Sequence, residues 1–343
     1  MRLILLAFAI VSFLYVIPSN ARELKILNLN MWAVELGWPE YFVSSPSLEL
    51  NERIHRLPGE IAKLQPDLIV FEEVWSDNRA EEIKALLKPL GYAYNASKSS
   101  DRGWFLDGGN GLLIVSKFKL DPEVQAFSYS TSTRWDESKF ICRKGGMKTR
   151  VELEPNKWVD LYATHLGATG VVTKNGMATE FTPNELKIQG EQIKEFIAFV
   201  NQTHTMQSMI VAADLNSHPF AFESGKYSET KHSDVYRLLT CADGVTDCLH
   251  LKDNSASAKF FTYDTSQNHY AKSADFATEP EGRIDYVFSQ GEELAATASS
   301  LAFKDNPLSD HYGLTTSFEF KPTVEVRQAL RLPSAAAPST VGP

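Results

Sequence analysis

An apolar run from Met209 to Ala213 ends abruptly on two polar side chains, Asp214 and Asn216. The run predicts a buried β-strand, and because side chains alternate along a strand, these two point the same way. Pro219 then ends any ladder, since proline has no N–H to donate. Asp and Asn are disfavoured in strands, so their position indicates a use. For this stretch alone a strand that runs into an Asx-turn is the preferred explanation, and other stretches change that preference.

Strand-like and helix-like segments alternate unevenly along the chain. Strands are predicted over residues 24–32, 67–71, 111–118, 147–153, 158–165, 282–289 and 314–320, and helices over 54–65, 79–90, 184–200 and 233–239. Because the helices are few and unevenly spaced, a single parallel sheet is not expected. The pattern predicts an α+β fold, a four-layer α/β/β/α sandwich of two mixed β-sheets flanked by helices.

The two ends of the chain differ in composition from the part between them. Arg2, the apolar run 3–17 and Pro18-Ser19-Asn20-Ala21 are typical of a secretory signal peptide with a small-x-small cleavage site. An uncleaved anchor is the alternative, but the run is short for a membrane span. After Lys321 the chain is rich in Ala, Pro and Ser. We predict a signal peptide over 1–21, one folded domain over 22–321, a disordered tail over 322–343, and export to an extracellular, periplasmic or lumenal space.

The charge balance is acidic. The chain has 34 Lys and Arg against 43 Asp and Glu, a formal net charge of −9, and loss of Arg2 with the signal peptide would make it −10. An electrostatic hold on a polyanion such as nucleic acid is therefore not expected. A nuclease is still compatible with this charge, because a metal ion can supply positive charge locally.

The three cysteines allow two interpretations. Cys241 and Cys248 are close enough in sequence for a disulfide in an oxidising compartment, which would leave Cys142 alone. Three reduced, buried thiols are the alternative, and the sequence leaves both open. Asn95-Ala96-Ser97 and Asn201-Gln202-Thr203 fit the glycosylation sequon.

Polar side chains recur at the ends of the predicted apolar strands: Asn28, Glu73, His165, Asp214 with Asn216, Asp285, and Asp310 with His311. Each alone has an ordinary explanation as a cap, a turn or a buried ion pair, but their recurrence favours one shared site. Carboxylate and amide oxygens without thiolates indicate Mg²⁺, or Mn²⁺, rather than zinc. Histidines beside carboxylates supply acid–base groups near neutral pH. Together these groups predict attack of water on a phosphate ester.

Short motifs spread from residue 24 to 320 carry a family resemblance. They are Asn28-Leu29-Asn30-Met31-Trp32, Phe71-Glu72-Glu73-Val74-Trp75-Ser76, Gly109-Asn110-Gly111-Leu112, Arg143-Lys144-Gly145, Tyr162-Ala163-Thr164-His165-Leu166, Asp214-Leu215-Asn216-Ser217-His218-Pro219, Arg283-Ile284-Asp285-Tyr286-Val287 and Pro307-Leu308-Ser309-Asp310-His311. The chain resembles the endonuclease/exonuclease/phosphatase (DNase I-like) superfamily and, within it, the neutral sphingomyelinases. The Glu-Glu-Val-Trp-Ser, Asp-Leu-Asn-x-His-Pro and Lys-Gly segments favour the sphingomyelinase branch.

The resemblance implies a metal site and a general base. Glu73 would bind Mg²⁺ directly, Asn28 would help to hold that site, and Asp310 would support the metal or position the groups beside His311. His311 would act as the general base on water. Asp285 would orient His311 through its other ring nitrogen.

The resemblance also implies how the phosphate is handled. Asp214 and Asn216 would hold the attacking water and the phosphoryl oxygens. His165 would stabilise or protonate the leaving oxygen, and Lys144 would offset phosphate charge. The implied reaction is a phospholipase C-type hydrolysis of sphingomyelin, or a related choline phospholipid, at a membrane surface.

Two departures from the family pattern bear on this reading. Ala33 stands where the family has glycine, and the chain has a polar tail where animal-type relatives carry hydrophobic anchors. Its signal peptide instead resembles that of secreted bacterial sphingomyelinases. The alternatives are a nuclease or inositol-phosphate phosphatase of the same superfamily, and an inactive lipid-binding module. The oligomeric state is not predicted.

Two aromatic segments have no helical or strand period. One holds Trp38, Tyr41 and Phe42, and the other holds Tyr129, Trp135 and Phe140. Because such rings favour membrane interfaces, we predict that at least one segment inserts its rings at the lipid surface beside the site. Packing of the rings as a satellite core cluster is the alternative.

Overall fold

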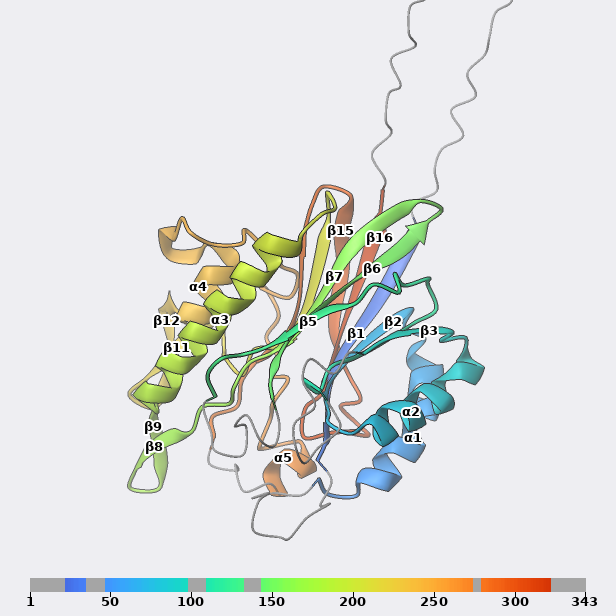
Figure 1. Ribbon diagram of the computed structural model, residues 1–343. Coiled ribbons are helices and arrows are strands. Elements are labelled where there is room, and N and C mark those ends of the chain that lie inside the picture. Colours follow the sequence, from blue (N-terminus) through green and yellow to red (C-terminus); the bar gives the residue numbers. More distant parts are fainter. Residues whose placement is uncertain (1–21, 35–46, 98–108, 133–142, 274–278, 322–343) are drawn as a thin grey trace, which may run out of the picture.

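The computed structural model describes residues 22–34, 47–97, 109–132, 143–273 and 279–321 (Figure 1). The predicted signal peptide and tail, Cys142, and all of the predicted membrane-facing aromatic residues except Tyr129 lie outside these ranges. None of the helices in the described ranges is both long and apolar enough to cross a membrane.

Two six-stranded mixed sheets form the centre of the molecule. The first has the order β15-β16-β1-β2-β4-β3 and the second β13-β14-β10-β7-β6-β5. The strands of the first are β1 (Arg22–Ala33), β2 (Leu68–Val74), β3 (Tyr94–Ala96), β4 (Leu113–Ser116), β15 (Leu294–Ala302) and β16 (Gly313–Phe320). Those of the second are β5 (Gln125–Ser128), β6 (Gly145–Glu154), β7 (Lys157–His165), β10 (Met209–Asp214), β13 (Lys252–Asp253) and β14 (Asp285–Gln290). In each sheet one pair is parallel, β1 with β2 and β7 with β10, and the other pairs are antiparallel.

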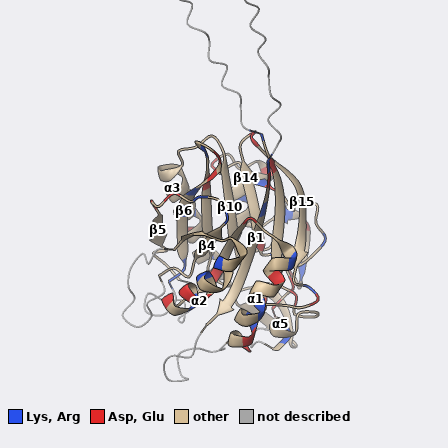
Figure 2. Ribbon diagram, turned by 90° about the vertical axis from the view of Figure 1, so that its right-hand side faces the viewer, with Lys and Arg blue, Asp and Glu red and all other residues tan. Residues whose placement is uncertain are grey.

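Helices cover the outer face of each sheet. Helices α1 (Leu50–Leu64) and α2 (Asp77–Leu87) pack on the first sheet (Figure 2), and α3 (Pro183–Thr203) and α4 (Asp234–Thr240) pack on the second. A separate apolar core fills the space between the sheets. This confirms the predicted four-layer α/β/β/α sandwich. The smaller elements are the hairpins β8 (Val171–Lys174) with β9 (Met177–Phe181) and β11 (Phe220–Glu223) with β12 (Lys226–His232), the short helix α5 (His269–Ser273), and the 3₁₀ turns η1 (Lys88–Leu90) and η2 (Ala242–Gly244).

The alternation of β1 places polar groups between the sheets. Leu27 and Leu29 pack against the helical layer, whereas Ile26 belongs to the core between the sheets. Alternation therefore turns Asn28 and Asn30 toward the space between the sheets. Both are buried, and a buried amide is costly unless something binds it.

A buried arginine joins α1 to the chain on either side of the site. The guanidinium of Arg53 is fully buried and donates hydrogen bonds to the carbonyl oxygens of Met31, Trp32 and Leu308, at 2.8, 2.9 and 2.8 Å. Because a buried charge without partners is costly, these bonds hold the end of β1 next to the segment that leads into β16.

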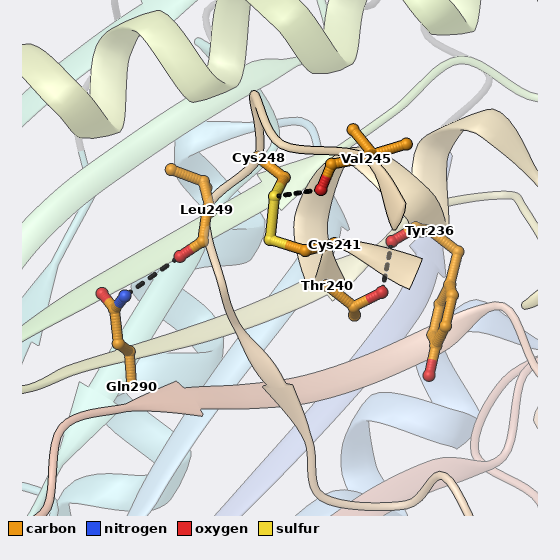
Figure 3. The surroundings of a disulfide bond; sticks show 7 residues. All are labelled: Tyr236, Thr240, Cys241, Val245, Cys248, Leu249 and Gln290. Atoms are coloured by element: carbon orange, nitrogen blue, oxygen red, sulfur yellow. Dashed lines mark hydrogen bonds between the residues drawn. A yellow bond between two sulfur atoms is a disulfide. The ribbon is translucent and has the colours of Figure 1, made fainter. Parts of the chain in front are cut away.

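Cys241 and Cys248 form a disulfide bond, which decides between the two interpretations of these cysteines (Figure 3). Their Cα atoms are 5.3 Å apart. Leu249, which follows the bridge, accepts a hydrogen bond from Gln290 at the end of β14, 3.0 Å away. The bridge therefore closes the segment after α4 into a short loop, and the Gln290 hydrogen bond ties the end of that loop to the second sheet.

Tyr129 does not have the membrane-facing role predicted for it, while Trp135 and Phe140 of the same segment lie outside the described residues. Its side chain is 6% exposed, and its hydroxyl lies 2.5 Å from Oγ1 of Thr164 on β7. The ring packs at right angles to Phe127, with centroids 5.2 Å apart. Tyr129 is therefore a core residue, because a ring tied into the sheet by its hydroxyl is not available to a lipid surface.

Candidate active site

Three neighbouring strands of the second sheet bring three predicted site residues together. The register pairs Asp214, the last residue of β10, with His165 of β7 on one side and with Asp285 of β14 on the other. All three are fully buried. Residues paired across adjacent strands present their side chains on the same face of the sheet. The strand register therefore places Asp285, Asp214 and His165 side by side in that order.

The first sheet contributes from the opposite side through Asn30. Its Nδ2 donates to Oδ2 of Asp214, 2.8 Å away, and to Oε1 of Glu73 at the end of β2, 3.2 Å away. The side-chain oxygen of Asn30 accepts from the backbone N–H of Trp32 at 2.9 Å. Asn30 was not among the predicted site residues, although it shares a strand face with Asn28. Its two hydrogen bonds link the first sheet to the second at the site.

His311 and Asp285 form a buried dyad. Nδ1 of His311 lies 2.9 Å from Oδ2 of Asp285, and Nε2 lies 4.0 Å from Oδ2 of Asp214. Burial alone would lower the pKa of His311, but the charges of Asp285, Asp214 and Asp310 outweigh it and hold that pKa well above its ordinary value. The dyad leaves Nε2 facing the centre of the site.

His165 has the opposite electrostatics. Burial, followed by the charges of Lys144 and His311, holds the pKa of His165 well below its ordinary value. Its Nε2 lies 3.3 Å from Asp214 and 3.7 Å from Glu73, and Nδ2 of Asn216 donates to it at 3.1 Å. The two histidines of the site therefore differ in charge near neutral pH, an arrangement that suits acid–base chemistry.

The carboxylates of the site indicate an affinity for a cation. Burial and the neighbouring charge of Asp285 raise the pKa of Asp214 to about 7, against the opposing effects of His311, Lys144 and Asn30. Burial also raises the pKa of Glu73, and the charge of Asp310 adds to that effect. Oδ1 of Asp285 is buried with no hydrogen-bond partner among the described residues. Ligand atoms of Asp214, Asp285 and His311 lie within 4.8 Å of one another. This oxygen-rich set fits a hard divalent cation.

Asn28 lies deeper than the other predicted metal ligands and adjoins Glu72 rather than Glu73. Burial, followed by Asp285 and Asp214, raises the pKa of Glu72 well above its ordinary value, and Asn28 opposes that rise. The polar side-chain atoms of Asn28 and Glu72 form no hydrogen bonds within the described part of the chain.

Asp310 and Lys144 flank the site. Asp310 is 8% exposed, and Oγ of Ser309 donates to its Oδ1 at 2.9 Å. Nζ of Lys144, which is 6% exposed, donates to the carbonyl oxygen of Leu166 at 3.1 Å, and its charge lowers the pKa of both Glu73 and Asp214. Gly145 is required beside it, because a Cβ there would lie 2.0 Å from the backbone oxygen of Phe127.

Strained backbone occurs where the strands deliver these side chains. Trp32, Glu73 and Asn216 have φ of 44°, 55° and 46°, a left-handed conformation that costs energy for residues other than glycine. Gly111 has φ of 72°, and a Cβ there would lie 2.6 Å from the ring of Trp75. Such strain concentrates at functional sites, and here it occurs at the ends of β1, β2 and β10.

Two supporting residues were missed by sequence reasoning because they lie in irregular segments. Oγ1 of Thr262 accepts the backbone N–H groups of Ile284 and Asp285 at 3.0 and 3.1 Å. The amide of Asn268 donates to the carbonyl oxygens of Ser309 and Asp310, both at 2.9 Å. These bonds position both members of the dyad. The structure thus brings the predicted site residues to one end of the space between the sheets, with Asn28 deepest, while their catalytic roles stay predictions.

His218, two residues after Asn216, yields a prediction about stability. Its ring stacks on Tyr227 with centroids 3.8 Å apart, and its Nδ1 accepts the backbone N–H of Phe220 at 3.1 Å. Burial and the charge of Arg283 lower its pKa from 6.5 to about 4. Because the folded-state pKa is depressed, stability is complete above the unfolded value and falls as the pH drops from 6.5 toward 4.

We expect His218→Gln to remove this dependence. Between pH 7 and pH 4.5 the wild type should lose about 2–3 kcal/mol more unfolding free energy than the variant. Urea unfolding of both proteins at the two pH values measures the difference. Equal losses would show that His218 titrates normally in the folded protein.

Comparison with known proteins places this geometry in context. Residues 27–311 match the Endonuclease/Exonuclease/phosphatase family. A Caenorhabditis elegans protein named "Putative neutral sphingomyelinase" is 25% identical over 316 residues, which cover 87% of this chain and 67% of the relative.

Several solved structures share the fold. The beta toxin of Staphylococcus aureus with bound magnesium ions is 17% identical with a TM-score of 0.61, over 88% of this chain and 100% of the toxin. Sphingomyelinase C from Streptomyces griseocarneus is 16% identical with a TM-score of 0.58, over 87% and 99%. TDP2 from D. rerio, complexed with a single-strand DNA product, is 15% identical with a TM-score of 0.58, also over 87% and 99%. At these identities the likeness establishes the fold alone.

Proposed function

The chain belongs to the endonuclease/exonuclease/phosphatase family, and from this we propose that it is a Mg²⁺-dependent phosphodiesterase that hydrolyses sphingomyelin to ceramide and phosphocholine. The observation that carries the proposal is the buried His311–Asp285 dyad, in which Nε2 of His311 faces Asp214 of the second sheet. Asn30 links that Asp214 to Glu73 of the first sheet. The name of the C. elegans relative and the sphingomyelinase-type sequence motifs support the lipid substrate over other phosphate esters.

The charges of the site favour a bound cation. Glu73 would bind Mg²⁺ (or Mn²⁺) directly, Asn28 would help to hold that site from its position beside Glu72, and Asp310 would support the metal. When bound, the ion neutralises substrate phosphate and offsets the carboxylates that keep His311 protonated. His311 would take a proton from water at Nε2, while Asp285 would hold the proton on Nδ1. The carboxylates raise the pKa of His311, and a cation beside them would make its imidazole a more available base.

The other side of the site handles the phosphate and the leaving group. Asn216 and Asp214 position the attacking water and the phosphoryl oxygens, and the ammonium of Lys144 offsets their negative charge. His165, which Asn216 contacts at 3.1 Å, would stabilise the departing ceramide oxygen, and it would protonate that oxygen once the phosphate of a bound lipid favours its charged form. We further propose that the protein is exported and acts as a peripheral enzyme on membranes.

Product release from a panel of defined substrates tests this function. We expect release of phosphocholine from sphingomyelin vesicles in the presence of Mg²⁺. EDTA should lower the rate of release by at least about 10²-fold. The panel includes single-stranded DNA and inositol phosphates, because a structural neighbour was solved with a DNA product. Turnover of DNA or inositol phosphates in place of choline lipids would overturn the proposal. Liposome binding without metal-dependent turnover of any substrate would indicate an inactive lipid-binding module.

A further inference from the structure

A cavity of about 250 Å³ adjoins the candidate active site. Helix α3, the start of α4 and the hairpins β8–β9 and β11–β12, which lie together in Figure 1, enclose it. Asn216 forms part of its wall and also contacts Nε2 of His165 at 3.1 Å. The cavity and the reacting centre therefore share one residue, yet the reaction as proposed leaves the cavity without a role.

The wall is lined by aromatic rings whose positions are fixed by mutual contacts. Phe220 stacks on His232, with centroids 4.7 Å apart and an angle of 21°, and Phe181 packs against Phe222 at 5.3 Å. His218 completes the set and is held by its stacking on Tyr227 and its bond to the backbone of Phe220. The faces of such rings carry partial negative charge.

The charged groups of the lining are mostly acidic. The lining contains three carboxylates, those of Glu180, Glu223 and Asp234, and one ammonium, that of Lys231. Lys231 forms an ion pair with Glu223. Asp234 is paired with Arg237 at 2.9 Å. Glu180 is exposed and has no ion pair within the described part of the chain. Because burial lowers the pKa of His218 to about 4, that ring adds no positive charge near neutral pH. The lining therefore favours a cation over an anion.

We propose that this cavity binds a quaternary ammonium group and, resting on the proposed function, that it holds the choline of a lipid whose phosphate lies at Asn216 and His165. A trimethylammonium group has no N–H to donate, so its diffuse charge gains more from ring faces than from hydrogen bonds. A primary ammonium instead needs oxygen partners at hydrogen-bond distance. Because carboxylates such as Glu180 could attract either head group, the ring faces are the part of the lining that would favour choline over ethanolamine.

The selectivity of turnover provides the first test. Phe220→Leu keeps an apolar side chain but removes the ring face. We expect it to lower kcat/KM for sphingomyelin by about 2- to 30-fold and to leave kcat/KM for ceramide phosphoethanolamine unchanged. Tyr94→Leu, which removes an exposed ring on β3 at the edge of the first sheet, should change neither value. Equal losses on both lipids would overturn the assignment.

A binding measurement separates the cavity from the lipid activity. Tetramethylammonium is titrated into the Mg²⁺-loaded full chain and followed by NMR chemical shifts, with ammonium as the probe of equal charge. We expect saturable binding of tetramethylammonium that Phe220→Leu, Phe181→Leu and Glu180→Gln each weaken. Glu229→Gln should have no effect, since Glu229 is an exposed carboxylate on β12 outside the lining.

The outcomes of the two tests are distinct. Selective tetramethylammonium binding by a protein that turns over no choline lipid would reject the proposed function and retain the cavity assignment. Absence of saturable binding, or equal response to both cations, would reject the cavity assignment even for an active sphingomyelinase. Phe181→Leu and Glu180→Gln keep the test valid if Phe220→Leu unfolds.

Discussion

His311→Ala is expected to lower kcat by about 10²–10⁴-fold, the usual contribution of a positioned general base. Asp285→Asn should be strongly impaired as well, because the 2.9 Å contact between Nδ1 and Oδ2 sets the orientation and tautomer of the imidazole. The double variant should be barely slower than His311→Ala alone, since residues that act as a unit have non-additive effects. Steady-state kinetics of the three variants, with circular dichroism to verify folding, measures this.

A second histidine–aspartate pair supplies the control. Nδ1 of His204 lies 2.8 Å from Oδ2 of the buried Asp160, near the opposite end of β7 from His165. His204→Ala removes a contact of the same kind and should lower stability without changing kcat. Multiplicative losses from His311→Ala and Asp285→Asn would count against the dyad.

Glu73→Gln is expected to lower activity by at least about 10²-fold at millimolar Mg²⁺ while the protein stays folded. Outer-sphere partners of a metal typically contribute 10- to 100-fold, so a direct ligand should contribute no less. Raising the Mg²⁺ concentration should recover part of the loss if the carboxylate acts through metal affinity. Activity as a function of Mg²⁺ concentration, with metal binding followed by calorimetry, separates affinity from rate.

The neighbouring Glu72 offers a matched comparison. Burial, Asp285 and Asp214 raise its pKa well above the ordinary value, which disfavours the charged carboxylate that a metal ion would bind. Glu72→Gln should therefore change the Mg²⁺ dependence little. Full activity of Glu73→Gln in EDTA would remove Glu73 from the metal site.

The sequence predicted the parts of the fold that have regular periods. The apolar run that ends on Asp214 is β10, and the helix expected over 184–200 is α3 (Pro183–Thr203). The hairpins β8–β9 and β11–β12 were not predicted, because β8, β9 and β12 contain no fully buried residue and β11 is only four residues long, so no alternating apolar pattern marks them.

The sequence identified which residues belong to the candidate site, but it did not show which of them contact one another. Strand ends identified Asp214, Asp285 and His165, but only the register shows that they are neighbours. Asn28 and Asn30 share one face of β1. The neighbouring sequence does not show that Asn30 is the one that contacts Glu73, whereas Asn28 lies further from the end of the strand. That difference arises from the left-handed backbone at Glu73 and from the approach of the second sheet.

The pairing of β1 with β16 affects how this chain is synthesised. Arg22 is the register partner of Phe320, so the first and last strands lie side by side. As the chain leaves the ribosome, β1 emerges long before β16, so the edge of β1 that pairs with β16 has no partner until the segment Gly313–Phe320 has been made. An open strand edge of this kind attracts other chains. The same adjacency makes the fold a suitable scaffold for circular permutation, with the old ends joined and new ones opened at the turn of hairpin β8–β9, because every strand then keeps its neighbours.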